Sequence, residues 1–238
     1  MEKPELTILY EDNHLIVVLK PQNMPSQGDS TGDLDLLTAV KDYIKQKYDK
    51  QGDAFVGLVH RLDRPTGGVM VFARTSKAAA RLAQQMPTGE FEKRYLAVIG
   101  GKPKDNQARL TNYLMKDEKT NTVKVVPATV EGAKKAELVY RVLDSGLKMS
   151  LVDIRLITGR SHQARVQMSY INTPIFGDVK YGDKLSKGQN LALWAYELKF
   201  YHPTTKVLMT FKAFPPVDKT PWKFFEIERF ISVARPPS

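Results

Sequence analysis

The sequence predicts an α+β fold in which a mixed, mainly antiparallel β-sheet is flanked by helices. Runs of β-branched and aromatic residues outnumber stretches with the apolar spacing of a helix. Several of these runs are separated only by short polar turns, the connection that joins antiparallel neighbours. The few helical stretches are amphipathic, as expected of helices that cover a sheet.

The N-terminal half alternates strand runs with amphipathic stretches. Apolar runs bounded by polar turns or proline predict strands over residues 6–10, 14–19, 55–59, 69–73 and 94–99. Apolar side chains at helical spacing predict helices over about 36–44 and over 76–86. Asp33 or Asp35 is the expected N-cap of the first helix.

The C-terminal half continues the same pattern. Strands are expected over residues 136–143, 149–157, 191–200 and 206–211, and helices over 162–171 and 222–231. In the strand over 149–157, Asp153 and Arg155 alternate with apolar residues, which predicts one wet face. The segment 102–135 has several lysines and few large apolar side chains, so it is expected to be the most irregular part of the chain.

Composition indicates a globular protein whose charge is compatible with a polyanionic partner. The chain has 238 residues, 42% of them hydrophobic, enough for one large domain or two lobes that share a core. Its net charge of +10 suits an anionic partner, although a solubilising surface explains it equally well. The absence of cysteine excludes disulfides and thiolate metal sites. Neither a signal-peptide core nor an apolar run of membrane-spanning length occurs, so we expect a cytoplasmic protein that does not bind membranes.

The most informative segment follows the apolar run over 55–59. It reads His60-Arg61-Leu62-Asp63-Arg64-Pro65-Thr66-Gly67-Gly68 and sets one carboxylate between two arginines. The proline fixes a backbone angle and the glycines permit left-handed geometry, so the loop is expected to hold Asp63 in place. On composition alone, a solvated ion pair of Asp63 with Arg61 or Arg64, worth ~0–1 kcal/mol, is the simpler interpretation.

A second constellation lies where a predicted strand runs into a helix. It reads Thr158-Gly159-Arg160-Ser161-His162-Gln163-Ala164-Arg165. Backbone N–H groups and the positive end of the helix dipole suit a phosphate there, and Arg160 adds a fork-shaped donor. Capping by Ser161 with solvated arginines is the simpler interpretation in isolation. Arg165 lies one turn into the helix, where it can face inward and meet a carboxylate.

A third feature is Glu92-Lys93-Arg94-Tyr95-Leu96-Ala97-Val98, which places a tyrosine at the start of a strand. Such a tyrosine can stack on a nucleic-acid base and offer a hydroxyl, although packing in the core is its common role.

Together and in this order, the three segments resemble the RluA family of pseudouridine synthases. The resemblance runs over most of the chain, from about residue 8 to residue 203, and includes Ile175-Phe176-Gly177-Asp178 and Lys180-Tyr181-Gly182. It implies the pseudouridine synthase catalytic fold as a single domain over residues 1–238. Many relatives begin with a small S4-type RNA-binding domain. Here the catalytic signature starts within the first dozen residues, so we expect no such domain.

The resemblance implies an enzyme that breaks the N-glycosidic bond of a uridine in RNA, turns the base and rejoins it through carbon, without cofactor or metal. Asp63 matches the catalytic aspartate of the family, Arg165 the arginine that pairs with it, and Tyr95 the tyrosine that stacks on the target base. An arginine partner favours the charged carboxylate, so Asp63 is expected to stay ionised at neutral pH.

The substrate implied is ribosomal or transfer RNA, and we expect a monomer. The target uridine must be flipped out of stacked RNA, and Arg61 is the residue expected to enter the vacated space. The residues expected to bind the substrate are His60, Arg61, Arg64, Arg160, His162 and Gln163. The sequence departs from the family pattern at Gly67, Gln167 and Trp194, and these departures leave the catalytic trio intact.

Three alternatives from other classes deserve weight. A glycosidase needs a second carboxylate, for which Asp178 or Glu92 is available, but the surrounding arginines suit RNA better than a neutral sugar chain. A metal-dependent nuclease needs clustered ligands, and the four histidines are scattered along the chain. A non-catalytic RNA-binding protein or RNA chaperone on the same fold would share the charge and the stacking residues. A variant Asp63→Asn that binds RNA normally and converts no uridine would separate that alternative from the enzyme.

Overall fold

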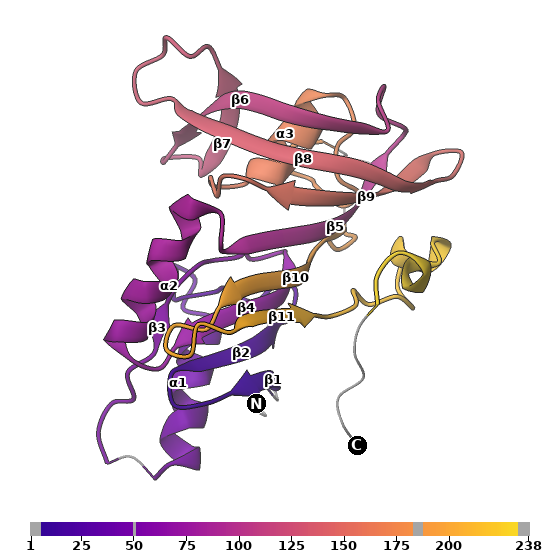
Figure 1. Cartoon of the computed structure of the whole chain (residues 1–238). Helices are drawn as coiled ribbons and strands as arrows, with labels where there is room; N and C mark the ends of the chain where they lie inside the picture. The colour runs from indigo at the N-terminus through magenta and orange to yellow at the C-terminus, as the bar shows by residue number, and fades with distance from the viewer. Residues whose placement is uncertain (1–5, 50, 183–187, 233–238) are drawn as a thin grey trace. The chain divides into compact units, whose positions relative to one another are not determined.

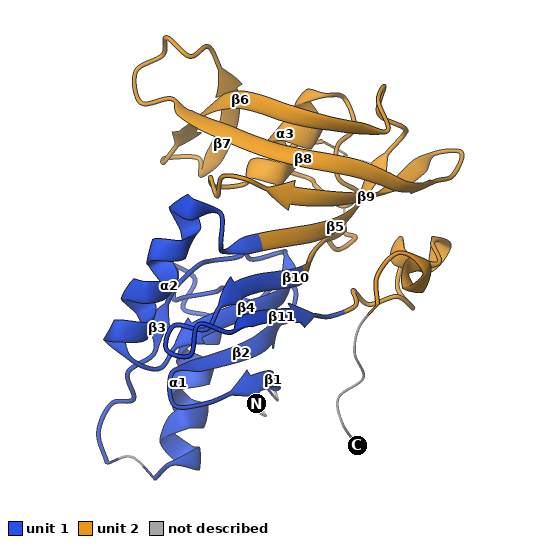
Figure 2. Ribbon diagram, in the orientation of Figure 1, with its two compact units in different colours: residues 1–92, 197–213 blue, residues 93–196, 214–238 orange. Residues whose placement is uncertain are grey.

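The computed structural model describes residues 6–49, 51–182 and 188–232 (Figure 1). The chain divides into two compact units (Figure 2). Unit 1 comprises residues 1–92 and 197–213, and unit 2 comprises residues 93–196 and 214–238. The assignment of residues 1–238 to a single catalytic domain stays a prediction.

The central strands of unit 1 are buried on both faces. Its elements are β1 (Thr7–Glu11), β2 (Leu15–Lys20), α1 (Leu36–Lys47), β3 (Gly57–Leu58), β4 (Gly67–Ala73), α2 (Ser76–Thr88), residues 197–201 of β10 (Leu193–Tyr201), and β11 (Leu208–Lys212). The strand order is β1-β2-β4-β10, with β11 paired to β10 and β3 paired to β4. Asp35 caps α1 by accepting a 3.0 Å hydrogen bond from the backbone N–H of Thr38.

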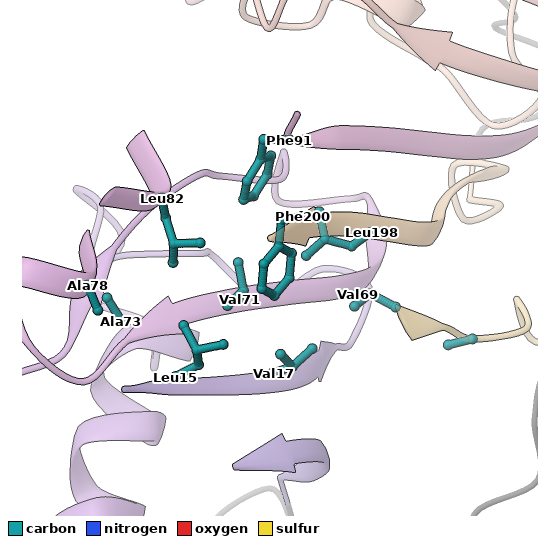
Figure 3. Packing of buried hydrophobic residues seen from close by; sticks show 11 residues of the cluster. Leu15, Val17, Val69, Val71, Ala73, Ala78, Leu82, Phe91, Leu198 and Phe200 are labelled. Carbon is teal, nitrogen blue, oxygen red and sulfur yellow. The ribbon is translucent and has the colours of Figure 1, made fainter. Parts of the chain in front are cut away.

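The core of unit 1 explains why β2 and β4 are continuous apolar runs. Leu15 and Val17 of β2 lie on the same side as Val71 of β4, and α2 adds Leu82 to this side (Figure 3). Phe200 of β10 stacks on Phe91, with ring centroids 5.7 Å apart. These strands have little polar surface because neither of their faces is wet.

Unit 2 carries the longest strands. Its elements are β5 (Glu92–Gly100), β6 (Gln107–Asp117), β7 (Thr122–Val126), β8 (Lys134–Ser145), β9 (Met149–Leu156), α3 (Gln163–Tyr170), the first part of β10, and the short 3₁₀ segments η2 (Trp222–Phe224) and η3 (Ile227–Arg229). The strand order is β10-β5-β9-β8-β6-β7. Val166 of α3 packs in a cluster with Leu114, Val123 and Ala136, so α3 lies on one face of these strands.

The predicted fold class is confirmed. Antiparallel registers are found for β1–β2, β2–β4, β5–β9, β8–β9, β6–β8, β6–β7 and β10–β11. Within the described ranges, no helix is both long and apolar enough to span a membrane.

The expectation of an irregular segment over residues 102–135 is wrong. β6 and β7 form a regular hairpin in which Leu114 pairs with Val125. Only one face of this hairpin packs on α3, and its exposed side chains are mainly polar. A strand pair of this kind needs few large apolar residues, which is why its composition suggested a loop.

The predicted C-terminal helix over residues 222–231 is also wrong. Trp222 and Ile227 are buried, but Phe225 between them is extended, with φ −129° and ψ 139°. The apolar spacing thus reflects separate anchors rather than one helix face.

Two strand predictions need narrower corrections. The run over 55–59 forms only the two-residue β3, and Phe55 is 50% exposed. Asp153 on β9 is buried rather than wet, because it pairs with Arg94 and accepts a 3.1 Å hydrogen bond from the Tyr196 hydroxyl.

Candidate active site

The loop that carries Asp63 joins β3 to β4 and begins inside the core of unit 1. His60 is buried, and its Nε2 accepts a 3.2 Å hydrogen bond from the backbone N–H of Val71. This hydrogen bond assigns the Nε2 of His60 as the unprotonated ring nitrogen. The His60 ring also lies edge-on to Phe91, with centroids 5.3 Å apart. His60 thereby anchors the start of the loop.

Loop residues on both sides of Asp63 are held by the segment between β2 and α1. The Ser26 hydroxyl donates to the Leu62 carbonyl at 2.7 Å and accepts from the Leu62 N–H at 3.1 Å. The Gln22 amide donates to the Pro65 carbonyl at 3.1 Å. Asp63 itself is half-buried, and its carbonyl accepts a 2.9 Å turn bond from the N–H of Thr66.

Gly68 has a φ of +128°, so the left-handed geometry expected of the glycine pair is confirmed at this residue.

Lys20 is the most unusual residue beside this loop. It is 0% exposed at the end of β2, and its ammonium donates to the carbonyls of Arg64 at 3.0 Å, Met24 at 2.6 Å and Pro21 at 3.0 Å. Burial lowers the pKa of Lys20 to about 7, against the attraction of the Asp63 charge, which raises it. Lys20 therefore ties the residue that follows Asp63 to the end of β2. The sequence showed a lysine before a proline and gave no sign of this burial.

Arg64 is directed toward neighbouring protein groups. Its Nε donates to the Asn23 carbonyl at 3.2 Å, its Nη1 donates to the Thr31 hydroxyl at 3.1 Å, and its guanidinium pairs with Asp29 and Asp33. Hydrogen bonds from Thr31, with a smaller effect of the Arg64 charge, hold the pKa of Asp29 below its ordinary range, and the hydrogen bond from Arg64 does the same for Asp33. Arg61, by contrast, is exposed. Contact of either arginine with RNA stays a prediction.

Tyr95 lies in unit 2 on β5, where it pairs with Ile154 of β9 and is mostly buried. Arg165 lies on α3 in the same unit. Its Nε and Nη2 each donate to one oxygen of Asp178 at 2.8 Å, in a bidentate pair whose side chains are 7% and 1% exposed. The Arg165 guanidinium also lies 5.1 Å from the centre of the Tyr181 ring.

Asp178 therefore serves as the ion-pair partner of Arg165. The sequence had also allowed it to be the second carboxylate of a glycosidase. Its Oδ1 also accepts from the backbone N–H groups of Lys180 and Tyr181, each at 3.2 Å. Its charge is committed to fixing Arg165. Pairing of Arg165 with Asp63 stays a prediction.

The turn before α3 is closed by Gln163. Its Oε1 accepts from the Thr158 hydroxyl at 2.7 Å and from the Arg160 N–H at 3.0 Å, while its Nε2 donates to the Glu137 carbonyl at 2.9 Å. α3 begins without a side-chain N-cap, so Gln163 stabilises the turn before the helix and the suggested capping by Ser161 is not found. His162 adopts a left-handed φ of +50°, and its Nδ1 hydrogen-bonds the Tyr181 hydroxyl. Arg160 is exposed, and its Nε donates to the Lys135 carbonyl at 3.0 Å.

Comparison with known proteins bears directly on this site. The family model described as RNA pseudouridylate synthase matches residues 14–170. The RNA pseudouridine synthase YhcT of Bacillus subtilis (strain 168) is 33% identical, over 91% of this chain and 71% of that protein. The ribosomal large subunit pseudouridine synthase C of Vibrio vulnificus (strain CMCP6) is 32% identical, over 87% of this chain and 64% of that protein.

Two solved structures of RNA pseudouridylate synthase domain proteins share this fold. Human RNA pseudouridylate synthase domain containing 4 superposes with a TM-score of 0.73 at 26% identity, covering 88% of each chain. Human RNA pseudouridylate synthase domain containing 1 shares the fold, with a TM-score of 0.72 at 22% identity. The ordered motifs around Asp63, Tyr95 and Arg165 resembled the RluA family, and the family match and the relatives confirm it: this chain belongs to the RNA pseudouridine synthases, which are isomerases.

Proposed function

We propose that this chain converts specific uridines of ribosomal RNA into pseudouridine, with Asp63 as the catalytic carboxylate. Relatives such as the Vibrio vulnificus protein, named for the large ribosomal subunit, favour ribosomal over transfer RNA. The observation that carries the role of Asp63 is the set of contacts that fixes its loop. Leu62 before it and Pro65 after it are hydrogen-bonded to the segment between β2 and α1, and the Arg64 carbonyl accepts from Lys20 at the end of β2.

The reaction needs neither an oxidant nor a second substrate. The bond from uracil N1 to ribose C1′ breaks, a bond from uracil C5 to C1′ forms, the C5 hydrogen leaves as a proton, and N1 gains a proton. One ionised carboxylate can serve as nucleophile or as base in such a sequence. A loop whose backbone is fixed can hold that carboxylate in reacting geometry without reorganisation during the reaction.

The other roles follow the family pattern. Arg165 is the proposed partner of the Asp63 carboxylate, and the Asp178 pair supports it by fixing the direction of the guanidinium. Tyr95 is proposed to stack on the flipped base and to assist removal of the C5 proton. Neither role requires a metal or a cofactor.

RNA binding is proposed to depend on the basic surface of the chain, whose net charge is +10. Arg61 is exposed beside Asp63 and is the proposed residue that fills the space left by the flipped uridine. Arg160 and His162 are proposed to contact RNA from the turn before α3, while His60, Arg64 and Gln163 support the loops behind these contacts. We also propose a monomer in the cytoplasm, where ribosomes reside.

The test is pseudouridine mapping by carbodiimide-based sequencing of total RNA from a strain that lacks the gene. The strain is then complemented with wild type, with Asp63→Asn, or with Asp53→Asn, a matched change at an exposed carboxylate of the same unit. We expect one or a few ribosomal pseudouridines to disappear on deletion and to return with wild type and Asp53→Asn only. Their return with Asp63→Asn, or an unchanged map on deletion, contradicts the proposal.

A further inference from the structure

Lys93 lies on β5 next to the proposed active-site tyrosine. It pairs with Leu156 of β9, and Tyr95 pairs with Ile154, so the two side chains project from the same face of the strand. Two residues along a strand span roughly 7 Å. The ammonium of Lys93 therefore lies within one nucleotide of a base stacked on Tyr95.

The charge of Lys93 is not neutralised by the part of the chain that the structure describes. No residue within 6–49, 51–182 or 188–232 forms an ion pair or a hydrogen bond with its ammonium. The next residue is different, because Arg94 pairs with Asp153 on the other face. Lys93 is half-buried, and burial alone lowers its pKa. Burying a cation without a partner costs free energy, which a bound anion can offset.

The ammonium also faces a feature suited to a phosphate. A Cβ placed on Gly159 would lie 3.1 Å from the Lys93 Nζ, so the ammonium rests against the backbone of the turn before α3. The exposed Arg160 follows Gly159 in this turn. The N-terminus of α3, the positive end of the helix dipole, begins at Gln163. Three sources of positive potential thus lie close together.

We propose that Lys93, with Arg160, binds a backbone phosphate of the RNA next to the target uridine. The proposal rests on the proposed function, since it assumes that Tyr95 stacks on the target base. Lys93 acts here as a point charge on the phosphate. A Cβ on Gly159 would make a tight contact with this ammonium.

The test compares uridine 3′,5′-bisphosphate with uridine, two probes that differ only in phosphate, in NMR titrations of the full chain. We expect Lys93→Met to weaken bisphosphate binding about tenfold, the loss typical of one charge-assisted contact, and to leave uridine binding unchanged. Lys93→Arg should retain most of the preference for the bisphosphate. Lys45→Met, at an exposed lysine of α1, is the matched control and should change neither affinity.

Gly159→Ala provides a second variant that keeps every charge. The added methyl group would lie 3.1 Å from the ammonium and shift it slightly, so bisphosphate binding should weaken by less than in Lys93→Met while uridine binding persists. The proposal is overturned if Lys93→Met binds the bisphosphate as wild type does, if it loses both ligands equally, or if wild type shows no preference for the bisphosphate. Asp63→Asn separates this outcome from the proposed function, because it should bind the bisphosphate normally and fail only in turnover.

Discussion

Asp63 owes its fixed position to backbone contacts made by residues far from it in sequence. Lys20 donates to the Arg64 carbonyl, and Ser26 donates to and accepts from Leu62. The motif over residues 60–63 points to Asp63, but no local pattern connects residue 20 or 26 to residue 63. Such partners come from tertiary pairing of β2 with β4, which brings Lys20 opposite Gly68.

Replacing Lys20 with Met tests this positioning role. The side chain keeps a similar volume but cannot donate to the three carbonyls, so the loop should lose its fixed geometry. We expect kcat to fall about tenfold or more with KM for RNA nearly unchanged, because misplacement of a reacting group lowers the rate and not substrate binding. Steady-state kinetics measure both constants. A raised KM with an unchanged kcat would show that Lys20 serves binding instead.

The buried lysine also makes stability depend on pH. In the folded chain the pKa of Lys20 is about 7, whereas in the unfolded chain it returns to the ordinary value of 10.5. Between these values the unfolded state binds more protons, so the contribution of Lys20 to the free energy of unfolding rises with pH across this window. Urea unfolding of wild type and Lys20→Met at about pH 6.5 and about pH 9.5 should show the difference between them shift in favour of wild type at the higher pH. A difference independent of pH would contradict the lowered pKa.

The ion pair between Arg165 and Asp178 is a second buried ionic interaction whose contribution to stability can be measured. Both side chains are almost fully buried, so Asp178→Asn removes the bidentate counter-charge that fixes the Arg165 guanidinium. We expect a loss of about 3–5 kcal/mol in the free energy of unfolding. Glu118→Gln, which removes the exposed partner of Lys116, should cost at most about 1 kcal/mol. Denaturant unfolding of the two variants measures the contrast, and equal losses would argue against a buried pair.

At the scale of elements, sequence pattern predicted best where a strand is buried on both faces or a helix has a clear N-cap. β2 and β4 are continuous apolar runs, and α1 begins at the Asp35 cap. The pattern failed for β6 and β7, whose exposed face is rich in polar side chains, and for residues 222–231, where isolated buried anchors imitate a helix face.

The turn that leads into α3 depends on one side chain. Gln163 is buried, and its amide makes three hydrogen bonds, to Thr158, Arg160 and Glu137. Gln163→Ala should lower the free energy of unfolding by about 2–3 kcal/mol, because it leaves buried donors and acceptors unsatisfied. Ser161→Ala should cost less than about 0.5 kcal/mol, as expected for an exposed residue of the same turn. A larger loss for Ser161→Ala would restore the capping role that the sequence suggested.

For the whole molecule, order along the chain was more informative than any single motif. Each of the segments around Asp63, Tyr95 and Arg165 has a simpler structural explanation, but their sequence order is that of one family, and the family match over residues 14–170 confirms it. Asp63 belongs to unit 1, whereas Tyr95 and Arg165 belong to unit 2. The partner of Arg165 within unit 2, Asp178, could not be derived from spacing, because it depends on how the segment after α3 folds back.

The central claim is that Asp63 carries out the isomerisation. The most direct measurement is the release of tritium from ribosomal RNA labelled at uridine C5, since the C5 hydrogen is lost when the new bond to C1′ forms. Purified wild type should release tritium, and Asp63→Asn should release none while binding the same RNA with wild-type affinity. Tritium release by Asp63→Asn at the wild-type rate would contradict the claim.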